Sequence, residues 1–296
     1  MKSLGLVALV GGLLAATTVG SPMIAQALAG LGFTFKFSRV YNRVFEVLLV
    51  IAIAATWRRF DLGNAETWGL RRPHWRRELC QGLAIGGVGI GIGLLVAWAG
   101  GGVVPALRFS ALKTVRKALL GLVGAGLIGV GEETLFRGIL LRRLVLDLGA
   151  GRGVLVTTSV YALVHALRGG ARITGTGWMA GWERTAGLFA PLADTAVWPG
   201  VLGLFGLGLL LAILRRRTGS LWVTIGVHAA WVSVFRVGRL FFDIRHRPAW
   251  LVGPGWPPLV GGAAGALSLA VTALVVRAWI RGRHPPIAQN PAHIRP

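Results

Sequence analysis

Five ionisable side chains lie within otherwise apolar stretches of this 296-residue sequence: Glu132, Glu133, Arg137, His165 and His228. They are concentrated between residues 132 and 228, after an N-terminal part that is also strongly apolar. A charged group inside a bilayer is costly and usually marks a functional site. These residues are therefore the candidates for chemistry.

The two adjacent glutamates are predicted to take different roles. Glu133 and Arg137 are four residues apart, so on a helix they share a face and can form an ion pair. Glu132 is turned by about 100° from Glu133 around the helix and can point elsewhere. We predict that Glu133 and Arg137 support the site, and that Glu132 is free for acid–base chemistry.

His165 and His228 could complete the site in two ways. A carboxylate and one histidine can activate water while the second histidine stabilises an oxyanion. Alternatively, Glu132, His165 and His228 could bind a divalent metal ion such as zinc, because two nitrogens and a carboxylate form a familiar catalytic ligand set. A purely structural role is the third interpretation. These residues alone do not decide between the alternatives.

The elements that carry these residues are predicted to cross a membrane. The chain is 54% hydrophobic and only 14% charged, whereas a soluble domain carries about 25% charged residues. Backbone in lipid must satisfy its own hydrogen bonds, so spans of this kind are helices. The sequence predicts an all-α bundle of seven to eight transmembrane helices, from apolar stretches at 3–33, 44–57, 79–103, 117–131, 153–167, 197–214, 220–235 and 257–280.

Three local features refine this topology. The first stretch resembles a signal peptide but lacks a convincing cleavage site, so we interpret it as a retained helix with a turn near Ser21-Pro22. Glycines before the glutamate pair predict a nearly side-chain-free helix face for close packing; they are Gly121, Gly124, Gly126, Gly129 and Gly131. The longest loop, 168–196, contains Trp178 and Trp182 and is expected at the membrane surface, where it could cap a site.

The strong positive charge indicates lipid headgroups rather than a nucleic acid. The formal net charge is +22, from 32 Lys and Arg against 10 Asp and Glu. The basic residues cluster between apolar stretches, a pattern typical of contact with anionic headgroups. Their distribution slightly favours both termini in the cytoplasm. Cys80 is the only cysteine, which excludes an intramolecular disulfide and a cysteine-based metal site.

Three segments together resemble the CAAX-protease and bacteriocin-processing (CPBP, or Abi) family of intramembrane proteases. Glu132-Glu133-Thr134-Leu135-Phe136-Arg137 resembles the family's EExxxR motif, and Tyr161-Ala162-Leu163-Val164-His165 its FxxxH motif with Tyr in place of Phe. Gly226-Val227-His228-Ala229 is similar to the segment with the third-motif histidine. The segments occur in the family's order over roughly residues 116–240, and Trp68-Gly69-Leu70-Arg71-Arg72-Pro73 looks like its upstream loop.

The resemblance implies an endopeptidase acting within or near the membrane. In that interpretation Glu132 with His165 activates water, Glu133 and Arg137 organise the site, and His228 helps to stabilise the oxyanion. The family has been described both as metalloproteases and as metal-independent glutamate-type proteases, and we favour the second. One departure is Val232, where the family usually has Asn or Asp, so one oxyanion donor is missing or supplied elsewhere.

We therefore predict three parts: N-terminal helices and a basic loop (1–115), a catalytic core (116–240), and a C-terminal helix with a basic tail (241–296). The expected partners are membrane lipid and a membrane-anchored, lipidated or sorting-tagged protein or peptide, in a prokaryotic cytoplasmic membrane. Two alternatives remain: an Abi-like scaffold or immunity protein with a weak or inactive site, and a small proton-coupled transporter. The sequence predicts no cofactor other than the possible zinc, and it indicates no oligomeric state.

Overall fold

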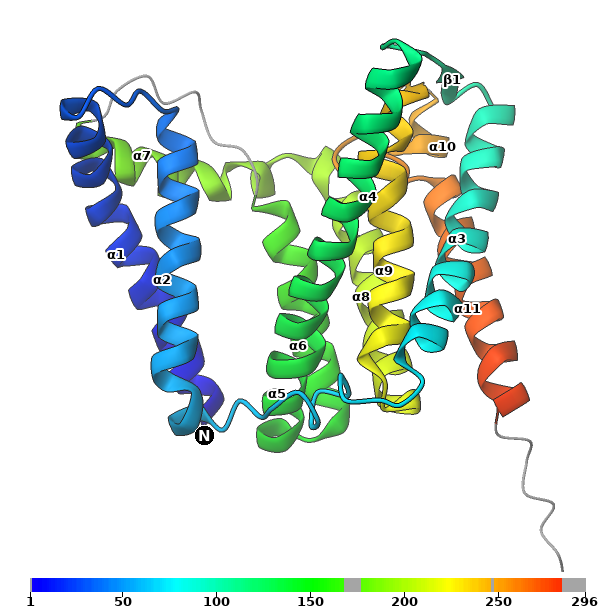
Figure 1. The fold of residues 1–296 in the computed structure, drawn as a ribbon, viewed down its shortest axis with the longest axis horizontal. Coiled ribbons are helices and arrows are strands. Elements are labelled where there is room, and N and C mark those ends of the chain that lie inside the picture. Colours follow the sequence, from blue (N-terminus) through cyan, green and yellow to red (C-terminus); the bar gives the residue numbers. More distant parts are fainter. Residues whose placement is uncertain (1, 168–176, 246–247, 284–296) are drawn as a thin grey trace, which may run out of the picture.

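The protein folds as a bundle of long helices (Figure 1), in a computed structural model that describes residues 2–167, 177–245 and 248–283. Seven segments of this described part are long and apolar enough to cross a membrane. They are α1 (Lys2–Gly30), α2 (Phe37–Phe60), α3 (Trp75–Ala99), the continuous stretch Ala111–Leu148, the stretches Thr195–Thr218 and Leu221–Leu240, and Ala263–Gly282. The prediction of a polytopic all-α membrane protein is thereby confirmed.

Shorter elements complete the described chain. The stretch 111–148 consists of α4 (Ala111–Glu133), the π-helix η1 (Thr134–Leu140) and α5 (Leu141–Leu148), and α6 (Ala150–Ala166) follows it. A small antiparallel sheet joins β1 (Val103–Pro105) to β2 (Phe242–Ile244). The remaining elements are α7 (Met179–Phe189), η2 (Ala190–Ala193), η3 (Thr195–Val197), α8 (Trp198–Thr218), α9 (Leu221–Arg236), η4 (Gly238–Leu240), α10 (Ala249–Val252) and α11 (Ala263–Arg283).

The first helix is continuous where a turn was predicted. α1 runs through Pro22 without a break, so the expected turn at Ser21-Pro22 is wrong. A proline removes a helical donor, and a membrane helix tolerates this where neighbouring groups compensate. Here the carbonyl of Thr18 faces α7, and a Cβ on Gly181 would lie only 1.8 Å from that oxygen. The glycine lets α7 pack directly on α1 at the proline.

The segment predicted as the long loop 168–196 is largely helical. Residues 168–176 lie outside the described part, but α7 and the short turns η2 and η3 follow. In Figure 1, α7 lies across one end of the bundle, roughly perpendicular to the long helices. Its exposed side chains include Trp178 and Trp182, an amphipathic residue type that favours the membrane interface. The expected surface position agrees with this orientation.

Among the described helices the most extensive contact joins α3 to α9, and it brings the two backbones close together. A Cβ on Gly82 would lie 2.2 Å from the carbonyl oxygen of Val223, and one on Gly226 would lie 2.4 Å from that of Leu79. The predicted glycine face of α4 is only partly used, since Gly129 faces α9 whereas Gly126 and Gly131 face open space. Small residues at such contacts let backbones approach closely.

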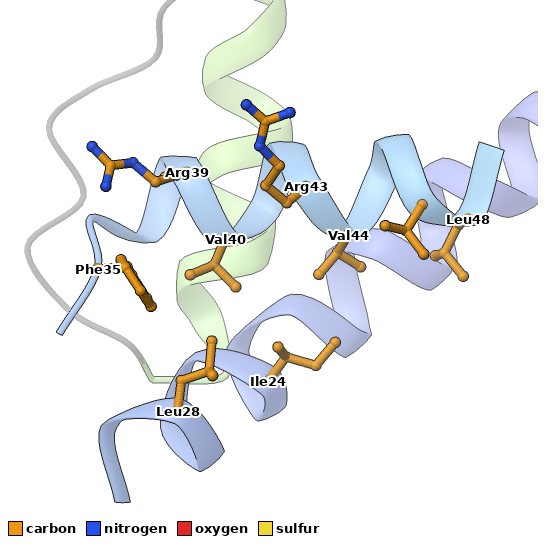
Figure 2. A pocket seen from close by; sticks show the side chains of 9 residues that line it. Ile24, Leu28, Phe35, Arg39, Val40, Arg43, Val44 and Leu48 are labelled. Atoms are coloured by element: carbon orange, nitrogen blue, oxygen red, sulfur yellow. The ribbon is translucent and has the colours of Figure 1, made fainter. Parts of the chain in front are cut away.

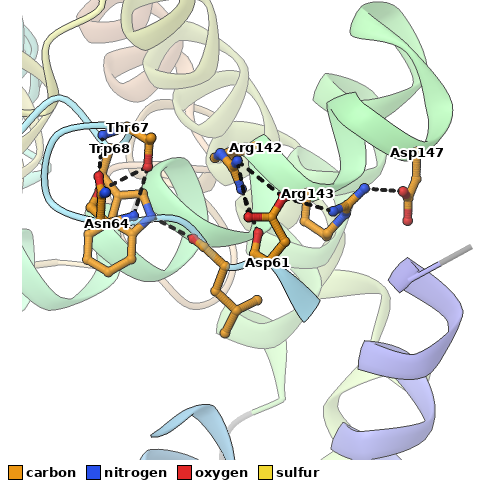
Figure 3. Close-up of polar contacts among 8 residues, drawn as sticks. Asp61, Asn64, Thr67, Trp68, Arg142, Arg143 and Asp147 are labelled. Carbon is orange, nitrogen blue, oxygen red and sulfur yellow. Dashed lines mark hydrogen bonds and ion pairs between the residues drawn. The ribbon is translucent and has the colours of Figure 1, made fainter. Parts of the chain in front are cut away.

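A polar network fixes the connection after α2 against α5 (Figure 3). Arg142 donates to the Asp61 carbonyl oxygen at 2.5 Å, and Arg143 lies 3.6 Å from the Asp61 carboxylate. The Trp68 indole donates to the carbonyl oxygen of Leu62 at 2.8 Å. Arg143 also pairs with Asp147, whose second carboxylate oxygen accepts from the backbone N–H of Ser3 at 2.7 Å. These contacts attach the α1–α2 pair to the helices that carry the predicted site.

Candidate functional site

The glutamate pair lies where the long helix changes its winding. Glu132 and Glu133 are the last residues of α4, and Arg137 lies within the π-helix η1. Such wider turns are rare, and they occur frequently at functional sites. The helix stays continuous into α5, so the change reorients side chains without breaking the span.

Glu133 and Arg137 form the buried pair that their spacing predicts. Nη1 of Arg137 lies 2.8 Å from Oε1 of Glu133, and the two side chains are 1% and 0% exposed. Arg137 also donates to the carbonyl oxygen of Gly208 in α8 at 3.3 Å. Its guanidinium lies 4.3 Å from the centre of the Tyr161 ring, a cation–π distance. One side chain therefore connects η1, α6 and α8.

His228 lies between the two glutamates, which the sequence did not predict. Its Nδ1 lies 2.8 Å from Oε1 of Glu133, and its Nε2 lies 3.7 Å from Oε2 of Glu132. An ionised carboxylate only accepts, so Nδ1 carries the proton and donates to Glu133. The neutral ring then presents the Nε2 lone pair toward Glu132. Glu133 is thus shared by Arg137 and His228.

His165 approaches Glu132 from α6. Its Nε2 lies 3.3 Å from Oε2 of Glu132, while its Nδ1 lies 2.8 Å from the carbonyl oxygen of Tyr161. Because a carbonyl oxygen only accepts, Nδ1 carries the proton and donates to it. In the neutral ring, Nε2 then has no proton and presents its lone pair to Glu132. The Tyr161 ring packs against His165 at a centroid separation of 4.5 Å and holds its orientation.

When both rings are neutral, Oε2 of Glu132 faces two acceptor nitrogens. It is a buried atom with no hydrogen-bond partner among the described residues, although the whole Glu132 side chain is 32% exposed and that of His165 15%. A buried unpaired polar atom is costly and calls for a bound proton donor. A water molecule at this point can donate to two of these three acceptors, such as Oε2 of Glu132 and Nε2 of His165.

All five predicted residues are thus brought together, on four helical elements. The pair 132–133 ends α4, Arg137 is in η1, His165 in α6 and His228 in α9. Two contributors were missed: the Gly208 carbonyl of α8, which carries no sequence signal, and the Tyr161 ring, which was noted only as a motif residue. Two hollows in the described part of the chain lie away from this site, one between α1 and α2 and the other along the first turns of α2.

The region around Val232 offers one uncommitted donor. The Ser233 hydroxyl donates to the carbonyl oxygen of Ala229 at 2.7 Å. The Trp231 indole N–H is buried and has no hydrogen-bond partner within the described residues. Of these two polar neighbours of Val232, only the indole is therefore free to donate.

The side chains proposed as metal ligands include the donor types that zinc prefers. Glu132, His165 and His228 are of the right chemical types, with one carboxylate oxygen and two imidazole nitrogens facing one another. Within residues 2–167, 177–245 and 248–283, however, no group of three or more His, Cys, Asp or Glu side chains has the geometry to hold a metal ion. The choice between a metal-bound and a metal-free site therefore stays a prediction.

These features define a class: a polytopic helical membrane protein with a buried glutamate–histidine–arginine centre. Residues 114–234 match the family model described as type II CAAX prenyl endopeptidase Rce1-like. The match includes all five site residues and confirms the resemblance to the CPBP family. No curated protein and no solved structure matches the chain.

Proposed function

We propose that this chain is an intramembrane endopeptidase of the CAAX-protease type. The observation that carries the proposal is the approach of Glu132 Oε2 to both Nε2 of His165, at 3.3 Å, and Nε2 of His228, at 3.7 Å. The Rce1-like match over the same segment supports the reaction class. An unpaired carboxylate oxygen beside two histidines is suited to general acid–base chemistry.

In this proposal Glu132 and His165 activate a water molecule. The water donates one hydrogen bond to Oε2 of Glu132 and is oriented by Nε2 of His165. Glu132 removes a proton as the water oxygen bonds to the carbonyl carbon of the substrate peptide. The same proton then passes to the leaving nitrogen as the carbon–nitrogen bond breaks, which gives a carboxylic acid and an amine.

His228 is the proposed oxyanion donor. Its Nε2 can donate only when the ring carries a second proton, because Nδ1 already donates to Glu133. The Glu133 carboxylate next to the ring stabilises that cation, and Arg137 holds the carboxylate in place. A donor of this kind contributes about 10²–10³-fold to the rate. Glu133 and Arg137 are positioning residues in this scheme.

The proposed substrate is a membrane-anchored, lipidated or sorting-tagged protein or peptide. Glu132 lies within a predicted span, so a substrate must reach it from the membrane or its boundary. We propose a prokaryotic cytoplasmic membrane as the location, on the basis of the Arg- and Gly-rich composition. The name of the matched family indicates prenylated substrates. For this chain, prenylated proteins are one of the lipidated substrates that we propose.

The test uses the full-length protein reconstituted in liposomes. A peptide library with randomised residues next to a lipid or transmembrane anchor is incubated with it, alongside the same library without an anchor. Mass spectrometry identifies new termini. We expect cleavage of anchored peptides and slow or no cleavage of the unanchored library. Equal cleavage of both libraries would contradict a membrane-bound substrate.

Metal dependence is tested in the same assay. We propose a metal-free mechanism, so a chelator should leave cleavage unchanged. Loss of cleavage with chelator, restored by added zinc, would replace this mechanism with one in which Glu132, His165 and His228 bind the ion.

Val232 favours one second candidate, an Abi-like scaffold with a weak or inactive site. The resemblance leads us to expect Asn or Asp at this position, but the valine side chain has no polar group that could stabilise an oxyanion. Replacing it distinguishes the two functions: Val232→Asn should increase cleavage if the wild-type site is active but short of a donor. Cleavage in neither form, with the variant folded, would support the scaffold.

A further inference from the structure

A groove runs between α1 and α2, away from the glutamate–histidine site. It encloses about 400 Å³, within the range of about 300–1,000 Å³ that is usual for ligand sites. We call this feature the α1–α2 groove. Its floor is apolar and is formed by Ile24, Leu28, Phe35, Val40, Val44 and Leu48 (Figure 2). None of the five site residues contributes to it.

Two arginines form one rim of this groove. Arg39 and Arg43 line it together with the apolar floor, and Figure 2 shows their guanidinium groups directed away from α1 while Val40 and Val44 point toward it. Long basic side chains commonly place the stem on apolar surface and the charge in a polar region. Charge and apolar surface are therefore separated across α2.

The groove continues into a polar hollow that shares the same arginines. This second hollow encloses about 300 Å³ and adds Lys36, Ser38, Asn42 and Glu46 to the lining. Three cations thus face one anion, and Glu46 is paired with Arg43. Within the described residues, the Lys36 and Arg39 side chains form no ion pair. The hollow retains an excess of positive charge.

The order of these residues along α2 matches the layers of a membrane. The cations belong to the chain just before α2 and to its first two turns, and the apolar floor extends deeper to Leu48. Several side chains here are strongly exposed in the protein alone, including Val47 at 56% and Phe35 at 45%. An amphiphile with an anionic head and an apolar tail would cover both parts.

We propose that the α1–α2 groove binds one anionic phospholipid. Its phosphate contacts Arg39 and Arg43, with which it can form paired hydrogen bonds, and one acyl chain lies on the apolar floor. Basic pockets between transmembrane helices are suited to anionic headgroups. The site is separate from the proposed peptidase centre and does not depend on that activity.

Native mass spectrometry of the full-length protein in detergent tests this proposal. The probes are phosphatidylglycerol and phosphatidylcholine with identical acyl chains, added at equal concentrations. We expect one phosphatidylglycerol to be retained at roughly 10- to 30-fold lower concentration than phosphatidylcholine, since each of the two arginines near the headgroup contributes about fivefold. Equal retention of both lipids would overturn the proposal and leave only a non-selective apolar surface.

Three variants locate the site. Arg39→Gln with Arg43→Gln should weaken phosphatidylglycerol retention by roughly 10- to 30-fold. The matched control, Arg58→Gln with Arg59→Gln, removes the same charge at the other end of α2 and should have no such effect. Glu46→Gln removes the competing anion and should strengthen retention, a change of opposite sign that impaired folding would not produce.

Three further outcomes would count against a phospholipid site in the α1–α2 groove. Equal loss in the control pair would show general charge attraction rather than a site, and unchanged retention in the Arg39/Arg43 variant would exclude these residues. A dimer in place of the lipid-bound monomer would show that a second copy of the chain covers the groove. Each of these results would overturn the proposal.

Discussion

At the scale of single residues, His228 is where the two halves of the site meet. It contacts Glu133 through Nδ1 and Glu132 through Nε2, so the two glutamates are coupled through one ring. Arg137 and His228 both use the same oxygen of Glu133. Removing one partner of a buried ion pair leaves an uncompensated charge, which is strongly destabilising.

The Glu133–Arg137 pair should therefore show strong coupling in stability. Arg137→Gln leaves a fully buried carboxylate with His228 alone and should destabilise the protein by about 3–5 kcal/mol. The double variant Glu133→Gln/Arg137→Gln should be more stable than Arg137→Gln, because no uncompensated charge remains. Unfolding in detergent measures the stability of the wild type, of each single variant and of the double variant.

The exposed pair Arg43 and Glu46 provides the control, with side chains 73% and 54% exposed. The same substitutions there should change stability little, since exposed ion pairs contribute weakly. Purely additive effects at Glu133 and Arg137 would contradict a coupled buried pair.

How far the sequence could predict the site follows from the range of each contact. The pairing of Glu133 with Arg137 depends on local helix geometry, so their spacing was sufficient. The approach of His228 to Glu133 joins residues 95 positions apart, and it required the packing of α4 on α9. The acceptor on Gly208 is a backbone atom, which no residue type could indicate.

At the scale of elements, the position of α9 depends on its contact with α3. α9 carries His228, and Gly82 and Gly226 allow the two backbones to touch. α3 lies before the predicted catalytic core of 116–240, yet it supports that core directly. The predicted boundaries of the three parts remain a prediction.

Gly82→Ala should displace α9 and weaken both folding and catalysis. The added Cβ would lie 2.2 Å from the Val223 carbonyl oxygen, a backbone atom that can move only with its helix. Overpacking of this kind costs about 1–3 kcal/mol. The readouts are the unfolding midpoint and the rate of peptide cleavage.

Gly87→Ala is the matched control on the same helix, because its Cβ would meet nothing within 4 Å. It should leave both quantities near the wild-type values. If the two variants behave alike, the α3–α9 contact does not set the position of His228.

Element boundaries show what apolar patterns can and cannot predict. Seven of the eight predicted apolar stretches correspond to the long spans, because a segment that lies in lipid must be apolar in composition. The eighth, 153–167, falls on the shorter helix α6. The π-helix at 134–140 was not predicted, because its residues Thr134 to Leu140 would suit an ordinary helix equally well. The continuity of α1 depends on α7, whose Gly181 covers the proline-disturbed turn.

At the scale of the whole molecule, the N-terminal end of α1 and the C-terminal end of α11 lie at the same end of the bundle (Figure 1). The beginning of α3, the helix α5 and the end of α8 also lie there, and each carries an arginine cluster. Clusters of this kind face the cytoplasm more often than not. Both termini are therefore expected in the cytoplasm.

Fusions of a fluorescent protein that folds only in the cytoplasm test this orientation in a bacterial host. Fluorescence is expected from fusions at both termini and not from an insertion at Gly101, in the connection at the opposite end of the bundle. The shorter helix α6 also runs between the two ends of the bundle, so it adds an eighth crossing to the seven long segments. Fluorescence from one terminus alone would mean an odd number of crossings and would contradict this arrangement of helices.

The most direct test of the central claim, that Glu132 performs the chemistry, is the cleavage rate of Glu132→Gln in liposomes. The substitution keeps the size of the side chain and removes the proton acceptor facing His165 and His228. Glu66→Gln, on an exposed connection, is the matched control. We predict that Glu132→Gln lowers the rate by about 10²–10⁴-fold while Glu66→Gln retains the wild-type rate. Unchanged cleavage in a folded Glu132→Gln protein would contradict the account.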